Sequence, residues 1–473
     1  MLSKKLKIND VHYKILTLSN WISSTRNKNR YLAMADMKPG TLKLKREMGV
    51  IGGVALIAGT IIGSGIFMSP QFVLANAGSP GASLVIWALS GLISLCGALS
   101  YAEIGTLIPE SGGDFIYILR ICGPFPAFFT AYNYVLLART TSNTAVSISI
   151  AQYALAPFYA DCHPPQLMVK CAAAAALLVA SILNSLSVRL VIRIQVVFLV
   201  AKVGSLLVIV IGGLVAVIQD SSVLEGNLKV ENAFEGTQYS VSALGMAFYH
   251  GLWSFAGWYN LNYVIEELKK PEVNLPRAVL ITMSMVTVLY LLVNVSYFVV
   301  LTPRELITSS AVAVTWGNKV LGDWGWIMSV AAALSAFGSL NASFFSGGRV
   351  CFVAAREGHM PDILAMAHVH RLTPSPALIF TTIISLVVLI PGDFESIVPI
   401  VIPILILIAS VGLVLAPIVD SPQIEYLYVT LFIFSGVLVY VPFIHYKLCP
   451  GLLKKVTIFL QLFLEVAPAE KNL

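Results

Sequence analysis

Charged residues are scarce in this chain of 473 residues, because Asp, Glu, Lys and Arg together make up 11% of it. A soluble globular domain carries about 25% charged residues, and 57% of the present sequence is hydrophobic. This composition excludes an ordinary soluble domain. It predicts an all-α polytopic membrane protein, whose apolar helices cross the bilayer many times.

Metal-binding cysteine pairs and catalytic constellations are missing as well. The six cysteines are scattered and none forms a Cys-x-x-Cys pair, so we expect neither a metal site nor a cofactor. The few ionisable residues inside apolar segments lack the spacing of a Ser/His/Asp or metal site, which argues against an enzyme. His250 is expected to pack or to line a pore. We expect no nucleic-acid partner.

A cleavable signal peptide is also absent, because no apolar core follows the first basic cluster. Eleven of the 30 Lys and Arg residues precede Glu47, and the positive-inside rule places this tail, residues 1–46, in the cytoplasm. The tail is either a solvated topology signal, which we favour, or a contact for anionic lipid.

Apolar segments of about 20 residues, long enough to cross a bilayer, follow this tail. We predict eleven spans within a transmembrane transporter domain over residues 47–446, near 49–73, 82–108, 124–157, 168–187, 191–218, 239–266, 278–301, 326–352, 375–391, 396–418 and 424–446. Lys and Arg in the loops fit this scheme through the ninth span. An odd number of spans would place the tail of residues 447–473 outside, whereas its lysines indicate the cytoplasm.

The first span is interrupted by the stretch Gly59-Thr-Ile-Ile-Gly-Ser-Gly-Ile-Phe67. Glycine costs about 1 kcal/mol relative to alanine in a helix. Irregular backbone at membrane depth is tolerated only where it is buried in protein or lines a cavity. The backbone N–H groups freed there suit a carboxylate. The alternative is a glycine-rich packing face for another helix.

The sixth span is interrupted too, since Gly251, Ser254 and Gly257 lie at its centre among aromatic residues. A broken first and a broken sixth span are what an inverted five-plus-five repeat predicts, with the substrate site between the two broken helices. This pairing favours a substrate site over a packing face.

Several longer motifs carry a family resemblance. They are Gly59 to Phe67, Glu103 with Pro109-Glu-Ser-Gly-Gly113, Gly251-Leu-Trp253 with Gly257-Trp258, Asn262-Tyr-Val-Ile-Glu-Glu267 followed by Asn274-Leu-Pro276, Arg356-Glu-Gly-His-Met360 and Arg371-Leu-Thr-Pro374. In them the chain resembles the light chains of the heteromeric amino-acid transporters, within the amino-acid/polyamine/organocation superfamily. The nearest type is the cystine/dibasic exchanger light chain and its relatives, including an aromatic-preferring member.

The resemblance implies sodium-independent exchange of L-amino acids across the plasma membrane, with a disulfide-linked, single-span glycoprotein as heavy-chain partner. It also implies a substrate site. The positions that match residues binding the carboxylate and amine are Ile61, Gly63, Ser64 and Gly65 on the first span, with Trp253, Ser254 and Ala256 on the sixth. Trp253 also matches an aromatic gate, although simple packing is the alternative.

Two further residues gain a role from the resemblance. Lys202, inside the fifth span, resembles a fixed substitute for the sodium ion of coupled transporters. A buried ammonium is expensive and usually functional, and snorkelling to an interface is the alternative. Cys162, in the loop of residues 161–165, matches the cysteine that bonds the heavy chain. A free thiol is the alternative.

Departures from the family pattern narrow the substrate. The cystine/dibasic light chain has an aspartate at the position of Ala256, so its loss disfavours cationic substrates and favours neutral ones, including large or aromatic amino acids and cystine. Arg139 in the third span is either a structural cation, which we favour, or a group that holds an anionic substrate.

The last departure is a missing span. Val398 runs directly into Pro399 where relatives have a tenth span and a basic loop. Restoring that span would return the C-terminal tail to the cytoplasm. A splice form, a faulty gene model and a tolerated variant all fit, and a non-transporting subunit that binds a heavy chain is the alternative function.

Overall fold

The computed structural model of the protein describes residues 46–159, 164–219, 233–309, 311–369 and 371–390, with isolated positions from 436 to 468 beyond them. The α-helices are α3 (Val50–Ile61), α4 (Gly65–Ala77), α5 (Pro80–Leu107), α6 (Asp114–Cys122), α7 (Pro124–Asn133), α8 (Arg139–Leu155), α9 (Gln166–Leu186), α10 (Val188–Gln219), α12 (Val241–Ser254), α13 (Pro271–Val300), α14 (Pro303–Thr308), α15 (Val312–Leu321), α16 (Trp326–Arg356) and α17 (Ser375–Leu389). The π-helix η1 (Tyr134–Ala138) joins α7 to α8, and the 3₁₀ helices are η2 (Ala156–Phe158), η3 (Asn260–Glu267), η4 (Gly322–Trp324) and η5 (Asp362–Ala365).

The prediction of a helical membrane protein is confirmed. Within the described ranges, five helices are long and apolar enough to cross a bilayer, namely α5, α9, α10, α13 and α16. The bent pair α3–α4 makes a sixth if it is counted as one span. The span expected at 396–418, the junction at 398–399, the tail of residues 1–45 and, apart from position 436, the span expected at 424–446 lie outside the described residues.

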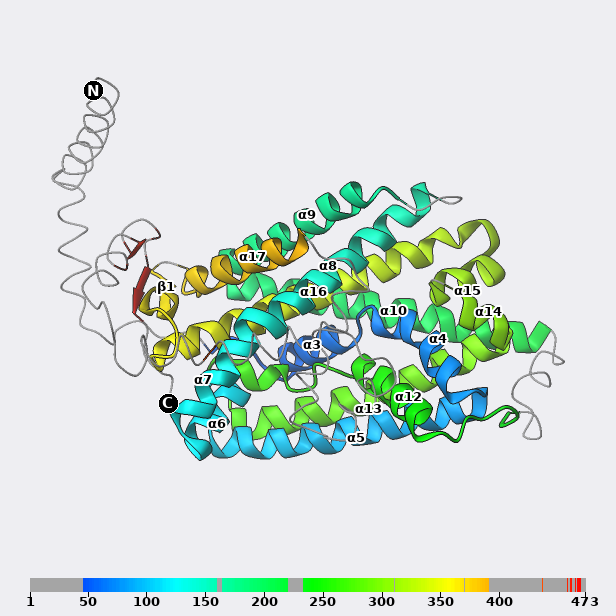
Figure 1. Ribbon diagram of the computed structural model, residues 1–473, viewed down its shortest axis with the longest axis horizontal. Coiled ribbons are helices and arrows are strands. Elements are labelled where there is room, and N and C mark those ends of the chain that lie inside the picture. The colour runs from blue at the N-terminus through cyan, green and yellow to red at the C-terminus, as the bar shows by residue number, and fades with distance from the viewer. Residues whose placement is uncertain are drawn as a thin grey trace, which may run out of the picture.

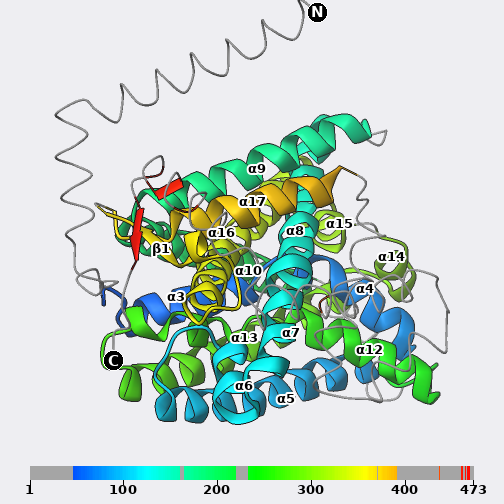
Figure 2. The same cartoon turned by 60° about the vertical axis from the view of Figure 1, so that its left-hand side comes forward.

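The helices form two groups (Figures 1 and 2). In the first group α5 packs along α13, and α12 packs on α4 and α5. In the second group α8 packs on α16, α9 and α17. α3 lies in the middle, between α13 and α16, and α10 contacts all three of these helices. A short antiparallel pair of strands, β1 (Met366–His368) and β2 (Val466–Pro468), lies beside the bundle.

The first break has a clear geometry. α3 ends at Ile61, Ile62 leaves the helical region with ψ at 85°, and α4 starts at Gly65. The two helices meet at 46°. Glycine suits two positions at this break. A Cβ on Gly63, between the helices, would lie 2.8 Å from Ser339 Oγ, and a Cβ on Gly65, the first residue of α4, would lie 3.0 Å from Ser254 Cα. The glycines therefore both interrupt the helix and allow close approach.

The second break follows α12. The helix ends at Ser254, and a turn leads to η3. Gly257 in that turn has φ of 117°, a left-handed conformation that glycine adopts without strain. A Cβ there would also lie 2.7 Å from Thr60 Cγ2 of α3. Each predicted interruption is thus a real break, and the two breaks lie against each other.

Candidate functional site

The structure brings the seven predicted substrate residues together. α4 packs on α12, and Gly65 meets Ser254 at the close approach described above. Ser64 and Ser254 are buried, at 5% and 2% exposure. Ile61, Gly63 and Gly65 are buried as well, whereas Trp253 and Ala256 are half-buried. These residues therefore lie at the two facing breaks, and their role in binding a substrate stays a prediction.

The break between α3 and α4 has opposite polarity at its two ends. The last carbonyl groups of α3 are the negative end of its dipole, and the first N–H groups of α4, from Gly65 onward, are the positive end of the other. An anion therefore suits the start of α4 and a cation suits the end of α3. A zwitterion can meet both.

Lys202 of α10 supplies a cation to the end of α3. Its ammonium Nζ donates to Gly59 O at 2.6 Å, to Ile62 O at 2.6 Å and to Ser339 Oγ at 3.0 Å. The side chain is 2% exposed, and these three bonds use all three ammonium donors. The ammonium thus binds the break instead of reaching an interface. Its role as a sodium substitute stays a prediction.

A polar stripe on α16 escaped the sequence analysis. It consists of Ser335, Ser339, Ser343, Ser346 and Arg349, spaced by four, four, three and three residues and therefore on one helix face. Ser335 Oγ donates to Ile62 O at 3.1 Å, and Ser339 Oγ donates to Gly59 O at 2.9 Å. The sequence did contain a signal for this stripe, because polar residues recur at helical spacing within an otherwise apolar span.

Arg139 of α8 binds the next serine of this stripe, Ser343, and also reaches Asn260 beyond the second break. Its guanidinium donates to Ser343 Oγ at 2.9 Å, to Asn260 Oδ1 at 3.1 Å and to the Tyr134 hydroxyl. Ser346 Oγ also donates to Asn260 Oδ1, at 2.7 Å. As a structural cation inside a span, Arg139 would be expected to bind backbone carbonyl groups or a carboxylate. Its hydrogen-bond partners among the described residues are instead hydroxyl and amide oxygens, and its Nε has none.

Tyr290 of α13 was also missed. Its hydroxyl lies 2.9 Å from Ile61 O and 3.3 Å from Ser254 O. These are the last residues of α3 and α12, so one side chain reaches both broken helices. Tyrosine is common in apolar spans, so the sequence gave no signal that set Tyr290 apart.

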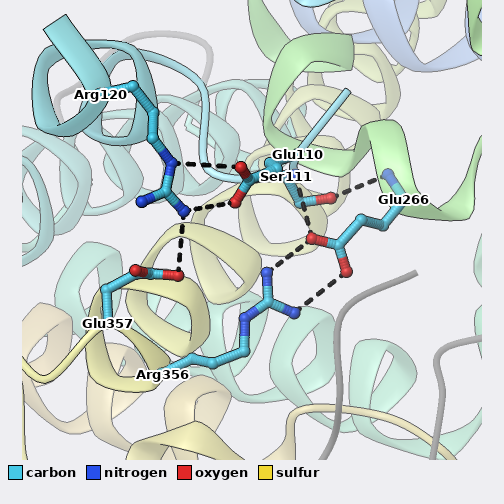
Figure 3. Close-up of polar contacts among 6 residues, drawn as sticks. All are labelled: Glu110, Ser111, Arg120, Glu266, Arg356 and Glu357. Atoms are coloured by element: carbon cyan, nitrogen blue, oxygen red, sulfur yellow. Dashed lines mark hydrogen bonds and ion pairs between the residues drawn. The ribbon is translucent and has the colours of Figure 1, made fainter. Parts of the chain in front are cut away.

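At one end of the bundle, an ion pair joins η3 to α16, and hydrogen bonds join η3 to the α5–α6 loop (Figure 3). Arg356 binds Glu266 through two bonds, of 2.6 and 3.0 Å. The Ser111 N–H donates to the same carboxylate at 3.2 Å, and the Glu266 N–H donates to Ser111 Oγ at 2.9 Å. Arg120 bridges Glu110 at 2.8 Å and Glu357 at 3.6 Å.

A second ion pair lies deeper. Arg349 binds the neighbouring Glu267, with Nε 2.7 Å from Oε1 and Nη2 3.3 Å from Oε2. The two side chains are 0% and 1% exposed. Adjacent glutamates at the end of η3 therefore each hold one arginine of α16.

The remaining predicted residues are quickly placed. Cys162 lies outside the described residues. Where the structure describes them, Cys96, Cys122, Cys171 and Cys351 are free thiols. Within the same ranges no group of three or more His, Cys, Asp or Glu could hold a metal ion. His250 stacks on Phe72, with ring centroids 4.8 Å apart, which fits the packing role that was one of its two expectations.

Comparison with known proteins decides the family. The family model described as amino acid permease matches residues 49–450. The chain belongs to the amino acid permease family. This permease is 43% identical to the human b(0,+)-type amino acid transporter 1 over 477 residues, which covers 93% of the chain and 97% of the relative. It is 42% identical to the human cystine/glutamate transporter (75% of the chain, 70% of the relative) and to the human large neutral amino acids transporter small subunit 2 (76% and 67%).

The fold has a solved counterpart. The crystal structure of MhsT in complex with L-phenylalanine aligns with a TM-score of 0.52 at 13% identity, covering 83% of this chain and 99% of that one. At this identity the match concerns the fold alone. The resemblance to light chains of heteromeric transporters is confirmed, as is the expectation of a transporter and not an enzyme.

Proposed function

We propose that this permease exchanges neutral L-amino acids across the plasma membrane without sodium, as the light subunit of a heteromeric transporter. Three relatives at 42–43% identity are named as amino-acid transporters, and one of them as a small subunit. The observation that carries the proposal is the ammonium of Lys202 on the carbonyl groups of Gly59 and Ile62, beside two facing breaks.

The substrate would lie between the breaks. Its carboxylate would meet the N–H groups around Ser64 and Gly65, at the positive end of α4. Its amine would meet carbonyl groups at Trp253, Ser254 and Ala256. The half-buried ring of Trp253 would close over the ligand from one side. Exchange by alternating access needs no covalent chemistry.

Sodium independence follows from the position of Lys202. Carbonyl and hydroxyl oxygens from α3 and α16 converge on one point, an arrangement that would suit a hard cation. The tethered ammonium already occupies that point, so the helix ends need no dissolved ion to stay together. A buried charge kept at such expense is functional by default.

A second candidate is an exchanger of anionic amino acids or cystine. The ion pairs formed among the described residues do not include Arg139, which is 8% exposed, and its Nε has no acceptor there. A substrate carboxylate could supply one. Ala256, which places no charge in the pocket, keeps neutral substrates as the first choice.

The proposal extends to partner and topology. Cys162 would form the disulfide to a single-span heavy chain outside the cell. The helices would form an inverted five-plus-five repeat that lacks its tenth span after Val398. The alignment with the human b(0,+)-type relative supports a missing segment, because it extends over 477 positions while covering 93% of this 473-residue chain, so part of the relative has no counterpart here. Tails 1–46 and 447–473 would both lie in the cytoplasm.

Counterflow in proteoliposomes tests the function. Vesicles holding the chain with a heavy chain, preloaded with unlabelled leucine, should accumulate labelled leucine equally in sodium and in choline buffer. Labelled glutamate and cystine test the second candidate, and arginine should be a poor substrate. A Cys162→Ser variant should lose the high-mass band on a non-reducing gel but keep exchange. Uptake that requires sodium, or no counterflow of any amino acid, would refute the proposal.

A further inference from the structure

The hydroxyl of Tyr290 joins the ends of two helices that the chain leaves broken. It lies 2.9 Å from Ile61 O and 3.3 Å from Ser254 O. Both carbonyl groups belong to the last turns of α3 and α12, where a helix cannot supply its own donors. Both are also at the negative ends of their helices. One phenol therefore reaches the same kind of group on each half of the site.

A phenol has only one O–H proton. Two carbonyl groups within reach must share it or take it in turn. The shorter distance favours Ile61 as the acceptor in the present structure. Ser254 O then receives at most a weak bond, and it retains lone pairs that can accept another donor.

The ring itself is held in place. Tyr290 is 0% exposed. Trp87 packs edge-on against its ring at 5.7 Å, and Phe255 packs at 5.0 Å. The oxygen is therefore fixed, while rotation of the O–H about the C–O bond needs no movement of neighbouring atoms.

We propose that Tyr290 is a positioning residue for the substrate's amino group. Its oxygen fixes the distance between the ends of α3 and α12, and its proton turns to Ile61 O so that Ser254 O can accept a bond from the ammonium group. This inference rests on the proposed function, in which carbonyl groups at the end of α12 receive the amine. A bond from a cation to that carbonyl is stronger than the phenol bond it replaces.

The same arrangement links the amine to Lys202. Ile61 O lies in the turn whose carbonyl groups at Gly59 and Ile62 bind the lysine. Tyr290 supplies a donor to the carbonyl between them. Binding of an amine at Ser254 therefore strengthens a bond to the turn that Lys202 holds, on the opposite side of the site.

Tyr290→Phe tests this with a single atom removed, and the chain offers a matched control. Tyr297 lies two turns along α13, is also 0% exposed, and its hydroxyl has no hydrogen-bond partner among the described residues. Binding of labelled leucine to the purified full chain should weaken about five- to tenfold in Tyr290→Phe, the usual effect of one lost buried hydrogen bond. Tyr297→Phe should stay within about twofold of the parent.

A second ligand separates positioning from general support. The α-hydroxy analogue of leucine has a hydroxyl in place of the ammonium, so it competes without a cationic donor. Tyr290→Phe should weaken this competitor less than it weakens leucine, and the ratio holds even if the variant melts at a lower temperature. Equal losses of affinity for the two ligands, or a Tyr290→Phe affinity equal to that of Tyr297→Phe, would overturn the inference. Neither result would contradict the proposed exchange function. A parent chain that binds no amino acid would overturn the proposed function together with it.

Discussion

The middle of α16 and its C-terminal end hold the broken segments by different chemistry. In the middle, Ser335 and Ser339 bind backbone carbonyl groups at the end of α3. At the end, Arg349 and Arg356 bind Glu267 and Glu266 through paired, charged bonds. A neutral hydrogen bond contributes about 0.5–1.5 kcal/mol, whereas removing one partner of a buried ion pair costs about 3–5 kcal/mol. Losing one of these serine bonds therefore costs less than losing one partner of either ion pair.

The largest effect is expected from Arg349→Met, which leaves Glu267 buried and unpaired. The free energy of unfolding should fall by about 3–5 kcal/mol, seen as a lower midpoint of thermal unfolding in detergent. Adding Glu267→Gln should recover most of the loss, because the uncompensated charge is gone. If Arg349→Met alone melts at the same temperature as the parent, the ion pair at the end of α16 does not hold more strongly than the serine bonds at its middle.

Lys202→Ala addresses the middle. The change removes three donors from the first break, and bonds from a charged donor contribute about 1.5–3 kcal/mol each. Exchange should fall to less than about a tenth of the parent rate. If the ammonium replaces a cation, sodium should restore part of the lost exchange and choline should not. Full activity of the variant would refute the role of Lys202.

Arg356→Ala should have an intermediate effect, since Arg356 is more exposed than Arg349, at 9% against 0%. Loss of this pair loosens the contact between η3, the α5–α6 loop and α16. Amide hydrogen exchange at Ser111, whose N–H donates to Glu266, should quicken by about tenfold or more. Protection unchanged at this position would show that the loop is held by other contacts. Lys319→Ala, in an exposed pair far from the loop, is the control.

The smallest effect concerns that control pair, Glu305 with Lys319. The backbone N–H of Thr302, followed by Lys319, lowers the pKa of Glu305 from 4.5 to about 2. A carboxyl with a depressed folded pKa stabilises the fold above its unfolded pKa, and the contribution is lost as the pH falls toward the folded value. The difference in melting temperature between Lys319→Ala and the parent should be slight at pH 7. It should shrink further as the pH is lowered from 4.5 to about 2. A difference that grows on acidification would contradict this account.

Sequence reasoning found what is local and missed what is distant. The breaks at Gly63 and Gly257 were predictable because glycine weakens a helix wherever it stands. Lys202 was predictable because a lone cation in an apolar span needs a reason. The partners of Arg349 and Tyr290 were not, since Glu267 lies 82 residues from Arg349 and Ile61 lies 229 residues from Tyr290. Such pairs are set by the packing of α13 on α3 and of α16 on η3, which no spacing in the sequence encodes.

Lys202 has one more consequence, for the energy source of transport. A charge that crosses the membrane gains or loses about 2.3 kcal/mol per 100 mV of potential. A dissolved cation that travels with its substrate brings this term into every cycle. The ammonium of Lys202 is fixed to α10 and is released on neither side, so a neutral amino acid exchanged for another carries no net charge across. The direction of exchange would then depend only on the gradients of the two amino acids, and the membrane potential would not drive it.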